Sequence, residues 1–138
     1  MKRIVAWLPV LVWMVTIFLL SSRSSVQISQ QDAINFLFFK TIHVIEYAIL
    51  YFFAYRAVRF ETQGAAYPYS FFLAYILCVL YASSDEIHQT MVPTREGHPR
   101  DVIIDTIGIL LSWILIRQLF PHLPKRLKTL GDKWLTVK

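Results

Sequence analysis

The sequence predicts an all-α fold: a four-helix transmembrane bundle with the N-terminus and the C-terminus in the cytoplasm. Three observations support this. Hydrophobic residues make up 56% of the 138 residues. Charged residues make up only 17%, against about 25% in an ordinary soluble domain. The charges gather in short clusters, and four long apolar stretches lie between them, which is the pattern of a membrane protein.

The first apolar segment, residues 4–20, runs for 17 residues without a charge. A membrane-spanning helix needs about 20 mostly apolar residues, with a range of about 17 to 25. Lys2 and Arg3 could instead begin a secretory signal peptide. However, the apolar run is longer than an ordinary signal core, and Leu19 stands where a small residue should precede a cut. A retained helix is therefore favoured.

The second segment, residues 34–55, contains three ionisable residues in an otherwise apolar stretch: Lys40, His43 and Glu46. Because a helix turns by about 100° per residue, these residues and Tyr47 fall within a sector of about 120°. Ionisable groups that face lipid are costly. We therefore expect this face to line the bundle interior or a water-filled cavity.

The third segment, residues 67–84, leads into a polar stretch with Asp85, Glu86, His88 and Gln89. If the helix continues through this stretch, Asp85, His88 and Gln89 share one face. Glu86 then points about 100° away from them. The polar stretch lies at the end of the helix that we expect at the outer side of the membrane.

The fourth segment, residues 101–120, has Asp101, Asp105 and Gly108 at spacings of four and three, so they share one helix face. A small residue on that face allows close packing between membrane helices. The preceding loop contains prolines and glycine, which are typical of turns. It also carries Arg95, which could reach back over the acidic groups.

The placement of lysine and arginine predicts the orientation. Ten of them lie on one expected side and three on the other. The ten are Lys2, Arg3, Arg56, Arg59, Arg117, Lys125, Arg126, Lys128, Lys133 and Lys138, and the three are Arg23, Arg95 and Arg100. This excess predicts both termini inside, in agreement with an even helix count. We expect a membrane domain over residues 1–120 and a basic cytoplasmic tail, residues 121–138, that rests on the inner leaflet.

The net charge of +5 does not indicate a nucleic-acid partner. A nucleic-acid binder gathers its basic residues on a solvated face, whereas here they lie mostly at helix ends. Membrane lipids with anionic headgroups are the expected partner. Cys78 is the single cysteine, so no intrachain disulfide can form. The sequence identifies neither a metal nor another cofactor, and it does not define an oligomeric state.

Polar residues from three helices and one loop are thus expected at the outer half of the bundle. Those suited to acid, base or orienting roles are candidate catalytic residues: His43, Glu46, Asp85, Glu86 and His88. Those suited to holding a substrate are Lys40, Tyr47, Gln89, Arg95, Asp101 and Asp105.

In these residues the sequence resembles the VanZ-like family of small bacterial membrane proteins. The resemblance covers roughly residues 18–118. It is carried by Ser21-Ser22, by Lys40 with His43, Glu46 and Tyr47, by Asp85-Glu86 with His88-Gln89, by Pro93 and Arg95, and by Asp101, Asp105 and Gly108. Asp105 stands where the family more often has asparagine. The resemblance implies a multi-pass protein of the plasma membrane and cell envelope, and the founding member is linked to teicoplanin resistance. It does not supply a biochemical activity.

The residues leave three hypotheses open, of which the first is structural. The charges would form a buried ion-pair network that sets the register of the helices, since membrane charges are tolerable when paired. Under this hypothesis Lys40 pairs with Asp85 or Asp105, and Arg95 pairs with Asp101.

The second hypothesis is enzymatic: hydrolysis or group transfer on a lipid-linked or envelope substrate at the outer face. His43 and His88 are the candidate proton carriers, and Ser84 near His88 is a weak candidate nucleophile. In a metal-dependent variant, the pairs His43/Glu46 and Asp85/His88 would ligate a divalent ion, although Lys40 beside them would repel it.

The third hypothesis is binding or transport without chemistry. An outward cavity with Lys40, Arg95 and carboxylates would hold an anionic lipid or a glycopeptide. The expected partners are membrane lipids and a lipid-linked cell-envelope precursor. Transport is less expected, because four helices are few for alternating access and no inverted repeat is visible.

Overall fold

A computed structural model describes residues 2–23, 29–62, 67–93, 95, 97–119 and 122. This part of the chain contains helices and no strand. The helices are α1 (Lys2–Ser21), α2 (Asp32–Glu61), α3 (Tyr67–Gln89) and α4 (Pro99–Ile114), followed by the π-helical turn η1 (Leu115–Leu119). The predicted all-α class is confirmed. The predicted basic tail, apart from residue 122, lies outside the described residues.

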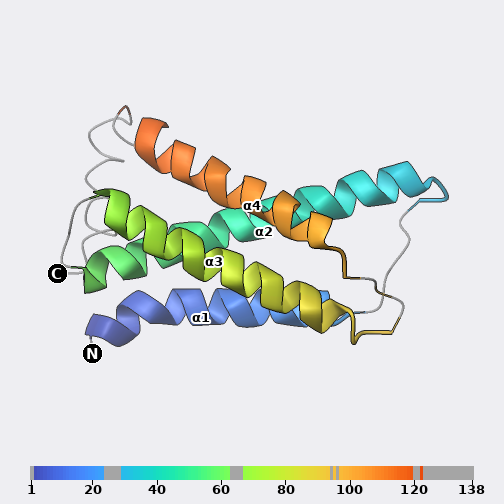
Figure 1. The fold of residues 1–138 in the computed structure, drawn as a ribbon, viewed down its shortest axis with the longest axis horizontal. Helices are drawn as coiled ribbons and strands as arrows, with labels where there is room; N and C mark the ends of the chain where they lie inside the picture. The colour runs from blue at the N-terminus through green and yellow to red at the C-terminus, as the bar shows by residue number, and fades with distance from the viewer. Residues whose placement is uncertain are drawn as a thin grey trace.

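The helices form an up-and-down bundle (Figure 1). α1 and α3 run in one direction, and α2 and α4 run in the other. We call the end where α1 and α3 finish and α2 and α4 begin the polar end of the bundle. α2 contacts each of the other three helices. It has 30 residues, about 45 Å of helix, and its first turns extend beyond the neighbouring helices (Figure 1).

α1, α2 and α3 are each long and apolar enough to cross a membrane. Their outer surfaces are apolar: Leu8 and Leu11 on α1 and Leu80 on α3 are all more than half exposed. α4 has only 16 residues before the chain enters the π-helical turn. Membrane crossing by this fourth helix therefore stays a prediction.

α2 continues beyond its predicted end at residue 55, and the two arginines expected in the following loop are helical. Arg56 is buried, and its Nη1 donates a hydrogen bond to the Val5 carbonyl of α1 at 3.2 Å. Pro9 has no N–H, so the Val5 carbonyl lacks its usual partner one turn later in α1. Arg56 supplies the missing hydrogen bond, and this contact allows α2 to extend along α1.

α2 and α4 approach each other closely where Gly108 faces α2. A Cβ atom on Gly108 would overlap the backbone carbonyl of Val44. The core beside this crossing consists of fully buried side chains such as Tyr47, Leu50 and Ile109. The predicted role of Gly108 in close helix packing is therefore confirmed, and this contact fixes how α4 is placed along α2.

Candidate functional site

Two side-chain contacts connect α2 to α4 at the polar end, each between a half-buried side chain of α2 and a buried aspartate of α4. Lys40 Nζ lies 2.5 Å from Asp101 Oδ2, and His43 Nδ1 lies 3.4 Å from Asp105 Oδ1. We expected Lys40 to pair with Asp85 or Asp105, and that expectation was wrong. The close contact at Gly108 sets the register of the two parallel helices, and this register brings Asp101 opposite Lys40.

Arg95 does not pair with Asp101, which corrects a second expectation. Its Nε donates to the Arg23 carbonyl at 2.8 Å, and its Nη2 donates to the Leu20 carbonyl at 3.3 Å. The last carbonyls of a helix have no partner within the helix. Arg95 therefore caps the end of α1 from the loop between α3 and α4.

A side-chain network continues from Arg95 into α3. Arg95 Nη1 donates to Gln89 Oε1 at 3.2 Å, and Gln89 Nε2 donates to Asp85 Oδ2 at 2.9 Å. Ser21 Oγ donates to Asp85 Oδ1 at 2.6 Å. Asp85 and Gln89 are both buried. The network joins the end of α1 to the end of α3 and to the loop that follows.

Glu86 faces a different neighbour, as its position on the helix predicts. Its Oε2 accepts a hydrogen bond from the backbone N–H of His98 at 3.0 Å, and His98 is the residue that precedes α4. A Cβ atom on Gly97 would overlap the Glu86 carbonyl. Glu86 therefore holds the loop against α3 at the point where α4 begins.

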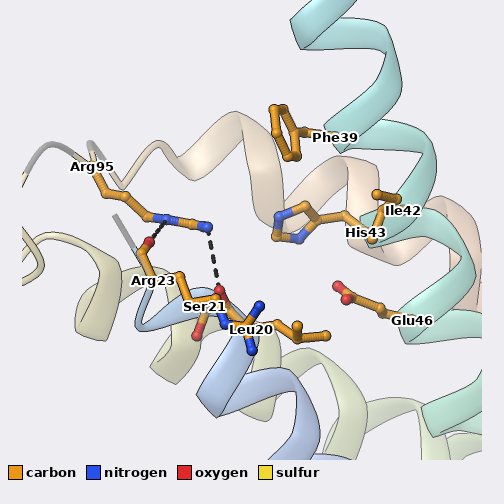
Figure 2. A pocket seen from close by; sticks show the side chains of 8 residues that line it. All are labelled: Leu20, Ser21, Arg23, Phe39, Ile42, His43, Glu46 and Arg95. Carbon is orange, nitrogen blue, oxygen red and sulfur yellow. Dashed lines mark hydrogen bonds between the residues drawn. The ribbon is translucent and has the colours of Figure 1, made fainter. Parts of the chain in front are cut away.

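A pocket of about 340 Å³ lies between the end of α1 and α2, with Arg95 at its edge. Figure 2 shows the His43 ring and the Glu46 carboxylate pointing from α2 toward Ser21 and Arg95. The lining residues are Leu20, Ser21, Arg23, Phe39, Ile42, His43, Glu46 and Arg95. Sequence reasoning proposed three of these as site residues: His43, Glu46 and Arg95.

Sequence reasoning missed the other lining residues for physical reasons. Leu20, Phe39 and Ile42 resemble any lipid-facing residues of a membrane helix, and only the packing of α1 beside α2 makes them pocket walls. Ser21 entered the sequence analysis only as part of the family resemblance and was not proposed as a site residue. Arg23 served only as evidence for orientation, and its place just after a charge-free helix was the one signal that could have indicated a headgroup contact.

His88 and Tyr47 are among the proposed site residues that do not line this pocket. The His88 ring packs against Phe18 with ring centroids 4.4 Å apart, and its Nε2 lies 3.0 Å from Ser22 Oγ. Ser84 instead donates to the Tyr81 carbonyl, so it is not the serine that contacts His88. Tyr47 is fully buried beside the Tyr81 ring.

Lys40 and His88 lie at the same end of the bundle but face different helices. The Lys40 side chain contacts α4, and the His88 side chain contacts α1. The polar residues therefore do gather at one end, as the sequence predicted. However, they form separate groups around the pocket and do not share one centre.

The chemistry of the pocket comes from one imidazole, one carboxylate and two guanidinium groups. Because Asp105 faces Nδ1 of His43, Nε2 is the ring nitrogen left for a ligand. In the described part of the chain, no cluster of three or more His, Cys, Asp and Glu side chains is placed to hold a metal ion. The pairs His43/Glu46 and Asp85/His88 do not converge as a metal site would require.

Comparison with known proteins gives a family but no close relative. A family model described as VanZ/LLP1 matches residues 6–121. No curated protein and no solved structure matches the chain. The matched range begins within α1, ends two residues after η1 and includes every residue that lines the pocket.

Proposed function

The chain belongs to the VanZ/LLP1 family, and from this premise we propose that it acts in the bacterial plasma membrane as a multi-pass protein of the cell envelope. We propose that its α1–α2 pocket binds the anionic headgroup of a lipid-linked envelope molecule. Three apolar helices that are long enough to span a bilayer support the membrane assignment.

The observation that carries the proposal is the composition of the pocket. Arg23 and Arg95 supply guanidinium groups, which bind phosphate and carboxylate in a forked geometry. Leu20, Phe39 and Ile42 form apolar walls beside them. A site with cationic groups at its edge and apolar walls suits an amphiphile whose charged group lies at the membrane surface.

The charge distribution supports an outward-facing site. Lysine and arginine are enriched on the cytoplasmic side of membrane proteins. Ten of them are expected at the end opposite the polar end. The pocket would then open at the outer surface, where envelope precursors are used.

The proposal is tested by native mass spectrometry of the full chain in detergent with added phosphatidylglycerol. A basic residue near an anionic membrane surface contributes about 1 kcal/mol, so Arg23→Ala should weaken phosphatidylglycerol binding about fivefold. Arg3→Ala is the matched control, because Arg3 is also exposed but lies at the opposite end of the bundle. Equal binding by both variants and the unmodified chain would exclude the pocket as the headgroup site.

A structural role is the second candidate, and the side-chain network favours it for particular residues. Asp85, Gln89 and Arg95 are held by one another and by α1, and Glu86 is held by the His98 backbone. We propose that these residues shape the pocket. Of the candidate catalytic residues, His43 and Glu46 line it, so any reaction there would use His43 as the proton carrier.

A further inference from the structure

Glu46 differs from the other buried carboxylates at the polar end. Asp85 and Glu86 accept hydrogen bonds, and Asp101 and Asp105 face a lysine and a histidine. Glu46 is only 7% exposed, yet no hydrogen bond or ion pair to its carboxylate is found among the described residues. It is the buried carboxylate whose side chain lines the pocket.

The neighbouring Arg95 and His43 side chains donate no hydrogen bond to the Glu46 carboxylate in the described part of the chain, because their contacts are with other groups. The three guanidinium nitrogens of Arg95 donate to the Leu20 and Arg23 carbonyls and to Gln89. Nδ1 of His43 faces Asp105. A buried carboxylate with no donor is costly in a low-dielectric environment. A ligand that brings its own donor would remove this cost.

Arg95, in contrast, is a cation whose hydrogen-bond partners leave its positive charge unbalanced. Its three hydrogen-bond acceptors, two backbone carbonyls and one side-chain amide, are all uncharged. Among the described residues, no carboxylate makes a hydrogen bond or ion pair with this guanidinium at the pocket edge, and Arg23 adds a second positive charge there. The pocket thus offers a place for an anion at its edge and a place for a cationic donor at Glu46 (Figure 2).

We infer that the pocket recognises a zwitterionic phosphoethanolamine group, with the phosphate at Arg95 and Arg23 and the primary ammonium at Glu46. This inference rests on the proposed function and names the class of headgroup. An ammonium group offers three N–H donors, and a charge-assisted bond to a carboxylate is stronger than a bond to a neutral donor. A volume of about 340 Å³ suits a headgroup, and the acyl chains would remain in the bilayer.

The test compares phosphatidylethanolamine, phosphatidylglycerol and phosphatidylcholine by native mass spectrometry of the full chain in detergent. Phosphatidylcholine is informative because its quaternary ammonium keeps the charge but has no N–H donor. Phosphatidylethanolamine should bind about tenfold more tightly than either of the other two, since a hydrogen bond to a charged group is worth about this factor. This comparison needs no variant, so it does not depend on the folding of a mutant.

A variant tests the assignment of the ammonium to Glu46. Glu46→Gln keeps the shape of the side chain and removes its charge, so it should abolish the tighter binding of phosphatidylethanolamine relative to phosphatidylglycerol. Glu61→Gln is the matched control, because Glu61 contacts Arg3 and Trp7 far from the pocket. An unchanged lipid preference in Glu46→Gln would overturn the inference.

The outcomes separate this inference from the proposed function. If phosphatidylglycerol binds as tightly as phosphatidylethanolamine, the zwitterionic ligand is excluded and the anionic site stands. If no lipid responds to Arg23→Ala, the proposed function itself fails. Competition by soluble phosphoethanolamine would support recognition of the headgroup alone. Retained preference for phosphatidylethanolamine without that competition would support recognition of the lipid form.

Discussion

Arg56 and Pro9 are far apart in the sequence and act together at the end of the bundle opposite the pocket. Pro9 leaves the Val5 carbonyl without a donor from α1, and Arg56 Nη1 donates to this carbonyl and, at 3.4 Å, to the carbonyl of Ala6. A buried arginine in a membrane helix is expensive unless it is hydrogen-bonded. The proline thus creates the acceptor that makes the buried arginine tolerable.

This residue pair predicts an energetic coupling. Arg56→Met should lower the free energy of unfolding by roughly 1.5–3 kcal/mol in the natural chain. The loss should be smaller in a Pro9→Ala background, because the backbone N–H that this substitution restores can then satisfy the Val5 carbonyl. A double-mutant cycle by denaturant unfolding in detergent measures the difference, which we expect at about 0.5–3 kcal/mol.

Arg59→Met is the matched control for this cycle, since Arg59 lies in the last turn of α2, three residues after Arg56. Its effect should be the same with and without Pro9. An equal cost of Arg56→Met in both backgrounds would show that the proline is not the reason for the arginine contact.

α2 is the element that organises the site. Different faces of this helix contact α1, α3 and α4. The face toward α4 carries Lys40 and His43 paired to Asp101 and Asp105, while Phe39, Ile42 and Glu46 line the pocket beside α1. The position of α4 along α2 therefore controls which ring nitrogen of His43 faces the pocket.

The crossing of α2 and α4 predicts the effect of adding one methyl group. Gly108→Ala would place Cβ against the Val44 carbonyl, and backbone atoms cannot move aside as a side chain can. The helices must separate, at a cost of about 1–3 kcal/mol, and the Lys40–Asp101 contact should lengthen.

Thermal unfolding in detergent measures the effect of Gly108→Ala, with Ile107→Ala as the control on an exposed side of the same helix. We expect a clear decrease in melting temperature for Gly108→Ala and little change for Ile107→Ala. Equal melting temperatures for Gly108→Ala and the unmodified chain would show that the helices do not cross this closely.

The whole molecule has apolar side chains outside and polar side chains inside at one end. Large hydrophobic residues such as Ile4, Leu37 and Ile103 are about two-thirds exposed, whereas Asp85 and Asp105 are at most 3% exposed. This arrangement is stable only where the surrounding medium is itself apolar. It also requires the acidic residues to find partners within the bundle.

The expected orientation is testable with substituted cysteines. Asp32→Cys places a thiol at the exposed start of α2, and Arg3→Cys places one at the exposed start of α1. A membrane-impermeant maleimide should label Asp32→Cys in intact cells and Arg3→Cys only after lysis. The natural chain is the control, because its Cys78 is buried. The reverse labelling pattern would place the pocket on the cytoplasmic side and contradict the proposed function.

Much of this architecture could be predicted from local sequence. The predicted helices at residues 4–20, 34–55 and 67–84 correspond to α1, α2 and α3, because an uninterrupted apolar run is a local signal. The helix ends were less predictable. α2 extends through Arg56 since a carbonyl of α1 accepts its hydrogen bond, and no property of the α2 sequence indicates that partner.

The sequence by itself determined that the chain is all-helical and apolar outside, and that its polar residues meet at one end. Composition and helical periodicity suffice for the first two, because they act on each segment separately, and the alternating direction of successive membrane helices adds the third. Only the tertiary structure decided that Lys40 faces Asp101, that Arg95 caps α1, and that Glu46 lines a pocket with no donor of its own. Those outcomes depend on the register between helices, which the close contact at Gly108 and the packing of α1 against α2 set across long sequence separations.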